Sequence, residues 1–315
     1  MIPLGFSENY RQRPNQHHRP AGGEGDPLLV NMVSAITRIL PRGRGAIPRL
    51  VGHLFSDYLQ TCHITTRYGA KLAIAPSSLD LIATAINWGR SWEHWVYDTC
   101  RWIMPPEGVF YDIGANVGYM AIELLHQLPN TRGVLFEPQP QLVEALNRSK
   151  ELNAFQDRCQ ILECALSNSS GLAYLNRFNH DGHASISNQS QLKEQIKVRS
   201  MTLDDAVEKY LLPLPDVIKI DVEGYEGNVL QGGLKTLEAA RPSIIFECST
   251  MGQFQEISAI LRQVGDWRFF YALGSYRPLR QIPQNETLHG KTDILAIETA
   301  RSTDLPQEFH PYFSL

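Results

Sequence analysis

The feature of this sequence that most limits its fold is an alternation of short apolar segments with longer amphipathic ones through residues 105–300. The short segments have strand length, and the longer ones carry apolar residues at helical spacing. We predict strands at residues 108–113, 134–137, 159–162, 216–220, 243–247, 267–271 and 292–297. We predict helices at residues 117–128, 141–152, 227–239 and 254–264. This alternation is typical of an α/β fold with a mostly parallel sheet and helices on both faces.

The pattern changes at both ends of this region. The last two predicted strands have no helix between them, so we expect them to pair antiparallel. Ahead of the sheet, the spacing predicts helices at 28–40 and 47–60, a hairpin at 63–75, and one or two helices within 79–103, interrupted near Gly89. We therefore divide the chain into four parts. Residues 1–26 are a mobile polar leader, 27–104 a helical N-terminal or cap region, 105–300 the main domain and 301–315 a tail.

Composition excludes several kinds of partner. The 29 basic and 33 acidic residues give a net charge of −4, which argues against a broad nucleic-acid surface. An apolar run of membrane-spanning length is absent from the sequence, so we expect no stable membrane insertion. The five cysteines include no C-x-x-C pair and are odd in number, which favours reduced thiols in a cytoplasmic protein.

Acidic residues follow four of the predicted strands. Asp112 closes the first, Glu137 and Pro138 follow the second, Asp221 and Glu223 follow the fourth, and Glu247 closes the fifth. Ligands of open α/β sheets bind at the carboxyl ends of the strands. Carboxylates at such a place cost free energy unless they have partners, so we expect a binding site there.

The turn after the first strand is similar to a dinucleotide-binding turn but differs from it. Asn116 and Tyr119 stand where that fingerprint has its second and third glycines, and Asp112 directly precedes the turn. A carboxylate there repels a pyrophosphate but suits a cation. S-adenosylmethionine has an amino group and a sulfonium and no phosphate. Glu137 lies at the end of the second strand, where an acidic residue can accept hydrogen bonds from both ribose hydroxyls.

A family resemblance rests on several segments that occur in order. These are FYDIGANVGYMAI, LFEPQP, ALSNSSG, TLDD, VIKIDVEGYEGNVLQGG and IIFE, within about residues 108–250. Together they resemble the FkbM family of S-adenosylmethionine-dependent methyltransferases. The resemblance implies a Rossmann-like class I methyltransferase fold with a seven-stranded sheet whose last strand is antiparallel. It also implies S-adenosylmethionine as methyl donor and S-adenosylhomocysteine as product.

The resemblance also assigns cofactor contacts. Asp112 would hold the methionine amino end, Gly114 and Gly118 would let the cofactor lie close, and Asn116 would line the turn. Glu137, followed by Pro138, would bind the ribose. The remaining expected cofactor residues frame the adenine or follow the fourth strand, and they are Glu163, Ala165, Leu166, Asp221 and Glu223.

Methyl transfer to a hydroxyl is aided by a base that removes the proton. The candidate bases are Asp221, Glu223, Glu247, His180 and His183. The sequence favours His183 or His180, which lie where family members carry an acceptor loop, and Asp221 is the next candidate. These histidines, Asp181 and Asp221 could instead hold a metal ion. We predict no metal. A solvated loop without a catalytic role is the alternative.

Four residues are candidates for acceptor binding. Trp92 and Glu93 resemble a Tyr-Glu pair that precedes the core in the family, Ser185 lies in the acceptor loop, and Glu247 ends the fifth strand. The prediction is an O-methyltransferase of biosynthesis that acts on a hydroxyl of a sugar, glycan or secondary metabolite. The alternative is a carboxyl O-methyltransferase acting on a peptide or small-molecule carboxylate, which needs no base.

Two hypotheses from other functional classes compete with this prediction. A NAD-dependent oxidoreductase is disfavoured by the missing second glycine at Asn116. A non-catalytic Rossmann-like binding module is disfavoured because Asp112, Gly114, Gly118 and Glu137 are all present. We expect a small-molecule, glycan or peptide acceptor as partner, no nucleic acid, and allow for a homodimer.

Overall fold

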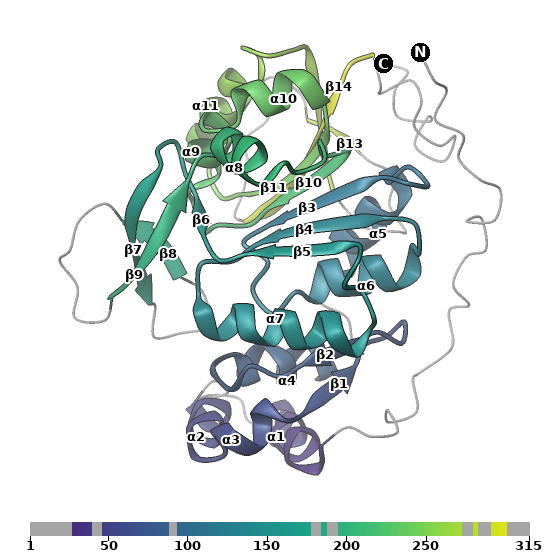
Figure 1. Cartoon of the computed structure of the whole chain (residues 1–315), viewed down its shortest axis with the longest axis vertical. Coiled ribbons are helices and arrows are strands. Elements are labelled where there is room, and N and C mark those ends of the chain that lie inside the picture. Colours follow the sequence, from purple (N-terminus) through teal and green to yellow (C-terminus); the bar gives the residue numbers. More distant parts are fainter. Residues whose placement is uncertain are drawn as a thin grey trace.

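The main sheet of the computed structural model has eight strands in the order β13-β12-β14-β11-β10-β3-β4-β5 (Figure 1). The structure describes residues 27–39, 46–87, 93–177, 184–187, 195–272, 280–282 and 291–300. The strands are β3 (Val109–Ile113), β4 (Arg132–Phe136), β5 (Cys159–Leu162), β10 (Val217–Ile220), β11 (Ser243–Cys248), β12 (Trp267–Tyr271), β13 (Arg280–Gln281) and β14 (Thr292–Glu298). All seven predicted strands are present, and the two-residue β13 extends the sheet at one edge.

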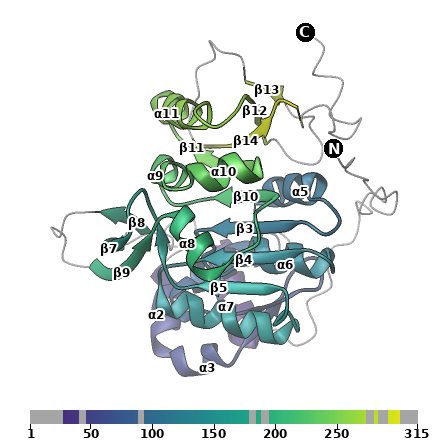
Figure 2. The ribbon, with the colours of Figure 1, turned by 45° about the horizontal axis from the view of Figure 1, so that its top comes forward.

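Strand direction confirms the predicted topology. Strands β5, β4, β3, β10 and β11 are parallel to one another. Strand β14 pairs antiparallel with both β11 and β12, so the last strand of the chain runs against the five parallel strands. Figure 2 shows β10, β3, β4 and β5 side by side in this order. The carboxyl ends of β3, β4 and β10 therefore lie at one edge.

Helices cover both faces of the sheet because alternate strand residues point to opposite sides. Phe110 of β3 packs with helices α5 (His94–Ile103), α6 (Tyr119–Gln127) and α7 (Pro140–Leu152). Tyr111, the next residue, packs on the opposite face. The helices of that face are α8 (Leu203–Tyr210), α9 (Glu226–Gln231), α10 (Leu234–Ala240) and α11 (Met251–Leu261). Helices α9 and α10 correct the prediction of one continuous helix, because Gly232 and Gly233 separate them.

The N-terminal region forms a layer on helices α6 and α7. It consists of α1 (Leu28–Ile39), α2 (Ala46–Leu54), α3 (Ser56–Gln60), β1 (His63–Thr65), β2 (Lys71–Ala73), a 3₁₀ turn (Pro76–Ser78) and α4 (Leu79–Asn87). The predicted hairpin and the predicted helix at 28–40 are confirmed, whereas the predicted helix at 47–60 is divided into α2 and α3 at Phe55. Val30, Leu72 and Ile82 belong to the same buried cluster as Phe110, so the layer and the sheet share one core. Across the described residues, every helix is too short or too polar to cross a membrane.

A small four-stranded sheet was missed by the sequence analysis. It has the order β6-β9-β7-β8, built from β6 (Ala165–Leu166), β7 (Gly171–Arg177), β8 (Ala184–Ser187) and β9 (Gln195–Met201). Its core is small, with Ala165, Ala173, Leu175 and Val198 as its buried apolar residues. Because so few apolar side chains are needed, the strands carry little hydrophobic pattern. Helix α8, also missed, begins where the Thr202 side chain accepts a hydrogen bond from the Asp205 backbone N–H at 3.0 Å.

Candidate active site

A cleft opens at the carboxyl ends of β3, β4 and β10, with a volume of about 960 Å³ that includes its opening to solvent. Clefts at this edge of an α/β sheet bind small molecules and cofactors. Ten residues predicted from the sequence line it, namely Glu93, Asp112, Gly114, Asn116, Glu137, Pro138, Ala165, Leu166, Asp221 and Glu223. Three predicted residues, Gly118, Glu163 and Glu247, are not among its lining residues.

Asp112 is the most unusual side chain of the cleft. It ends β3 with 1% of its surface exposed, and neither carboxylate oxygen has a hydrogen-bond partner among the described residues. Burial raises its pKa to about 6, against the opposing effect of Lys219, and the charge of Asp221 raises it further. A buried carboxylate without a donor is costly. Such a group fits a cationic ligand that supplies the missing donors.

The turn after β3 requires glycine at its first position. Gly114 has a φ of 81°, and a Cβ there would lie 2.1 Å from the Asp221 carbonyl oxygen. The turn is thus pressed against the end of β10. Asn116 also has a positive φ, of 52°, and its side-chain oxygen is buried without a partner. Gly118 begins α6 and packs on Leu146, so it shapes the turn from behind the cleft.

Glu137 connects this turn to the next strand. Its two carboxylate oxygens accept hydrogen bonds from the backbone N–H groups of Asn116, at 2.9 Å, and Gln139, at 3.0 Å. Burial raises its pKa to about 7 in spite of these bonds. A carboxylate has about four acceptor positions, so Glu137 keeps spare capacity for ligand hydroxyls. The position at the end of β4 and this spare capacity fit the predicted ribose contact.

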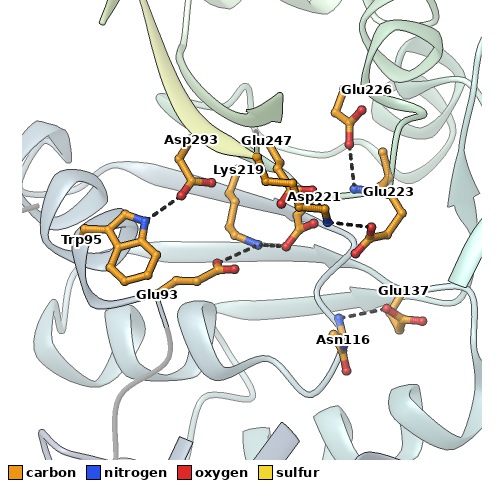
Figure 3. A network of polar contacts seen from close by, with 12 residues as sticks. Glu93, Trp95, Asn116, Glu137, Lys219, Asp221, Glu223, Glu226, Glu247 and Asp293 are labelled. Atoms are coloured by element: carbon orange, nitrogen blue, oxygen red, sulfur yellow. Dashed lines mark hydrogen bonds and ion pairs between the residues drawn. The ribbon is translucent and has the colours of Figure 1, made fainter. Parts of the chain in front are cut away.

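Lys219 stands at the centre of an ion network above the turn, as Figure 3 shows. Its ammonium lies 3.0 Å from an Asp221 oxygen and 3.8 Å from a Glu93 oxygen. Lys219 is buried, and the nearby carboxylates raise its pKa well above the usual value against the effect of burial. Lys219 therefore stays charged and orients the two carboxylates. Lys219 is absent from the cofactor contacts predicted from the sequence.

Glu93 reaches this network from outside the sheet region. It precedes α5 with a φ of 46°, a left-handed conformation that is costly for a residue other than glycine. Burial raises its pKa to about 7, partly offset by Lys219 and reinforced by Asp221, Asp293 and Glu247. The indole N–H of Trp95, two residues along the chain, donates to Asp293 at 2.6 Å and anchors α5 to β14. The fold thus holds Glu93 in the cleft at a conformational cost.

A second lysine pairs with the outer carboxylates. Lys291 lies 3.1 Å from a Glu223 oxygen and 2.9 Å from a Glu247 oxygen. Oxygens of Asp221, Glu223 and Glu247 lie within 4.8 Å of one another, a grouping that could hold a cation. The ammonium of Lys291 already brings positive charge to Glu223 and Glu247. Burial raises the pKa of Glu247, and Lys291 opposes this effect.

The predicted adenine end of the cleft is apolar. Pro138, Ala165 and Leu166 line it together with Cys164 and Leu175. Glu163 is instead exposed, because successive side chains of an extended segment point to opposite sides and Cys164 takes the inward position. Cys164 is buried, and burial raises its thiol pKa to about 11, so it serves as apolar lining.

Some predicted residues lie where the structure gives no side-chain description. His180, His183 and Trp92 are outside the described residues, and Ser185 is described only as part of strand β8. Their predicted roles stay predictions. Lys219 had a usable sequence signal, since it lies two residues before Asp221 and side chains two apart in a strand share a face. Trp95, Asp293 and Lys291 had none, because only tertiary packing brings them to the polar network beside the cleft.

Comparison with known proteins shows similarity to methyltransferases. The sequence model of the Methyltransferase FkbM domain matches residues 112–270. Methyltransferase sdnD of Sordaria araneosa is 25% identical over 193 residues, which cover 51% of this chain and 74% of that protein. The 2-O-methyltransferase NoeI of Sinorhizobium fredii (strain NBRC 101917 / NGR234) is 30% identical over 152 residues, 43% of this chain and 61% of that protein.

A solved structure is also similar. The methyltransferase FkbM of Methylobacillus flagellatus KT aligns with a TM-score of 0.42 at 13% identity, covering 70% of this chain and 54% of that one. The aligned region is therefore little more than half of that protein.

Proposed function

The chain belongs to the FkbM family of methyltransferases, and we propose that it transfers a methyl group from S-adenosylmethionine to a hydroxyl of a sugar, glycan or secondary metabolite. The observation that carries this proposal is the unpartnered, buried carboxylate of Asp112 in the cleft. A bound amino group would give that carboxylate both charge compensation and hydrogen-bond donors.

The residues of the cleft suit the proposed donor from end to end. Asp112 and the free side-chain oxygen of Asn116 would hold the amino end, and Glu137 would accept bonds from the ribose hydroxyls. Ala165 and Leu166 offer apolar surface for the adenine. When bound, S-adenosylmethionine supplies an electrophilic methyl carbon. The chain would then hold that carbon and the acceptor oxygen in line, which is where most of the rate gain can arise.

Charge around the ion network favours a hydroxyl over a carboxylate acceptor. Five carboxyl groups surround two lysines there, namely Glu93, Asp221, Glu223, Glu247 and Asp293. An acceptor with a negative charge would meet an excess of like charge, which costs binding free energy. A neutral hydroxyl would meet hydrogen-bond acceptors. This contrast supports the hydroxyl proposal over the carboxyl alternative.

A base in this cleft would receive the proton of the hydroxyl. His183 and His180 remain the bases proposed from the sequence. Among the described residues, Glu93 is the best-placed further candidate, because it lines the cleft and its pKa is raised to about 7. Asp221 is less suited because it already pairs with Lys219 at 3.0 Å. We propose Asp221 as a residue that orients Lys219 and, through it, Glu93.

The cofactor proposal is tested by calorimetry with S-adenosylhomocysteine. We expect micromolar binding to the wild type, a free energy of about −8 kcal/mol. Glu137→Ala should weaken it at least about tenfold, as loss of hydrogen bonds to a charged group does. The matched control is Glu163→Ala, an exposed glutamate outside the cleft, which should bind as the wild type does. Absence of binding to the wild type would overturn the proposal.

The acceptor atom is tested by the chemistry of the product. Protein incubated with methyl-labelled S-adenosylmethionine and a metabolite extract should give a labelled product. A methyl ether survives mild base, whereas a methyl ester is hydrolysed. Retention of label supports a hydroxyl acceptor, and its release as methanol supports the carboxyl alternative.

We propose that the reaction needs no resident metal, because Lys291 already pairs with Glu223 and Glu247 of the acidic group. Transfer should then continue in the presence of a chelator. We also propose a cytoplasmic location, which is supported by the five free cysteines, four of them buried. The same negative cleft supports a small-molecule, glycan or peptide acceptor over a nucleic acid.

A further inference from the structure

Eight large apolar side chains are exposed on the three N-terminal helices. The described residues contain twelve such side chains, so two thirds of them gather in this one region. The eight define what we call the N-terminal face, which consists of Leu28, Met32, Ile36, Ile39, Leu50, Leu54, Phe55 and Tyr58. Helices α1, α2 and α3 lie together at one end of the molecule, far from α10 and α11 (Figure 1). A grouping of this kind marks an interaction surface.

The exposed residues of α1 form one stripe. Leu28, Met32 and Ile36 are spaced four residues apart, and with 3.6 residues per turn they lie on one side of the helix. Ile39 continues the stripe with 81% of its surface exposed. The buried residues Val30 and Val33 lie on the other side. Helix α1 is therefore apolar on both its inner and its outer side, whereas a surface helix is normally polar outside.

Helix α1 cannot turn this stripe inward, because polar bonds fix its inner side. The Ser34 hydroxyl lies 3.2 Å from the Ala83 carbonyl oxygen and 2.9 Å from the Asn87 side-chain oxygen. The Asn87 amide also donates to the Ser34 carbonyl oxygen at 3.1 Å and to the Thr37 hydroxyl at 3.2 Å. Rotation would break these bonds, of which the bond between Ser34 and Ala83 is fully buried. The outer stripe is a fixed property of the folded layer.

The charge of this segment identifies the kind of partner. From residue 27 to residue 60, the span of α1 to α3, the sequence holds four arginines and one acidic residue, Asp57, in a chain whose net charge is −4. Arg38 and Arg49 are exposed on α1 and α2 beside the apolar side chains. Exposed apolar side chains with arginines at their border are what an amphipathic helix presents to a bilayer with negative headgroups. We propose that the N-terminal face docks on an anionic lipid surface.

Charge also argues against a second copy of the chain, and against residues 1–26, as the partner of the N-terminal face. In a two-fold dimer the same face meets itself, which would bring arginines against arginines. Residues 1–26 hold three arginines and three acidic residues, so they offer no compensating negative charge. A bilayer with anionic lipids matches both the apolar and the basic part of the face. This docking is independent of the proposed function, since it uses none of the cleft residues.

The test is sedimentation of the full chain with lipid vesicles. Vesicles of phosphatidylcholine mixed with phosphatidylglycerol should bind the protein at low salt, and vesicles of phosphatidylcholine alone should bind it far more weakly. Added sodium chloride should release it, because salt screens exposed charges. The double variant Met32→Glu, Leu54→Glu should bind at least about tenfold more weakly, since it places two charges in the apolar face. Leu172→Glu, an equally exposed leucine on β7, is the matched control and should bind as the wild type does.

Three outcomes overturn the docking proposal. These are no binding to anionic vesicles, equal binding to both kinds of vesicle, and a wild-type dimer in light scattering that the double variant converts to monomer. Thermal unfolding should show that the double variant is folded, because both replaced side chains are exposed. Calorimetry with S-adenosylhomocysteine separates this inference from the proposed function. Vesicle binding can fail while cofactor binding persists, and cofactor binding can fail while vesicle binding persists.

Discussion

The cleft at the sheet edge and the N-terminal layer differ in which groups the fold leaves without a partner. In the cleft, Asp112 and Asn116 hold buried polar atoms that no described residue satisfies. In the N-terminal layer, buried Ser34 has hydrogen bonds, but Leu28 and Ile39 on the outside are uncovered. The first region lacks a polar or charged partner inside, and the second lacks an apolar partner outside. Each deficit indicates the chemistry of what binds there.

The largest expected effect comes from Gly114, at the closest contact of the cleft. Gly114→Ala should lower the free energy of unfolding by more than about 3 kcal/mol, because a Cβ would collide with the Asp221 carbonyl oxygen and the φ is positive. Gly224 has a similar φ of 89° but no atom within 4 Å of the added Cβ. Gly224→Ala should therefore cost only about 1 kcal/mol. Equal losses in chemical denaturation would contradict the steric explanation.

A second prediction concerns ligand binding at Asp112. Asp112→Asn should weaken S-adenosylhomocysteine binding roughly 10- to 100-fold, because the amide cannot compensate an ammonium. The unliganded variant should be at least as stable as the wild type, since it loses a buried charge. Asp216→Asn is the control, because Asp216 lies at the opposite end of the sheet and accepts a hydrogen bond from the Val109 N–H at 2.9 Å. If calorimetry gives Asp112→Asn wild-type affinity, Asp112 has no role in binding.

The same carboxyl gives the binding a pH dependence. Its pKa is raised to about 6, with Lys219 and Asp221 as its charged neighbours. Below that pH the protonated carboxyl no longer attracts a cation, so affinity for S-adenosylhomocysteine should fall as the pH is lowered through 6. Asp112→Asn should flatten this fall. A wild-type affinity that is constant between pH 5 and 8 would assign the amino end to another residue.

A third comparison sets Asp112 beside Glu123, a buried carboxyl of α6 that has a partner. Glu123 accepts a hydrogen bond from the Tyr68 N–H at 3.1 Å, and burial still raises its pKa to about 8. A carboxyl with a raised folded-state pKa contributes stability below its unfolded value near 4.5, and this contribution is lost as the pH rises toward 8. Relative to Glu123→Gln, the free energy of unfolding of the wild type should fall by on the order of 2 kcal/mol between pH 5 and pH 8, measured by chemical denaturation. Parallel stability curves would show that Glu123 does not titrate in this range.

The smallest effect is expected on the outer face of α1. Ile36→Lys should change the free energy of unfolding by less than about 0.5 kcal/mol, as surface substitutions do. The buried neighbour Val33→Ala should cost more than about 1 kcal/mol, because it opens space in the core. Thermal unfolding of the two variants checks the contrast. A large loss for Ile36→Lys would mean that the outer stripe is covered within the protein.

The sequence by itself determined the order of seven strands of the main sheet and of the helices α6, α7 and α11 between them. Residues such as Val109–Ile113 and Val217–Ile220 are buried strands whose apolar runs are visible in the chain, and the acidic residues that follow them must meet at one sheet edge. Local spacing also placed the turn at Gly114 and the carboxylates Asp112 and Glu137. These features depend on neighbours in sequence and on the regular geometry of parallel sheets.

Tertiary structure decided what those local patterns leave open. Lys219 meets Glu93, and Trp95 meets Asp293 198 residues away, only after α5 and β14 pack against the sheet. The small sheet of β6 to β9 needs few apolar residues and so leaves little periodic signal. The exposure of Ile39 likewise follows from which side of α1 the core takes. Partners distant in sequence and the choice of buried face depend on packing, and no local pattern records either one.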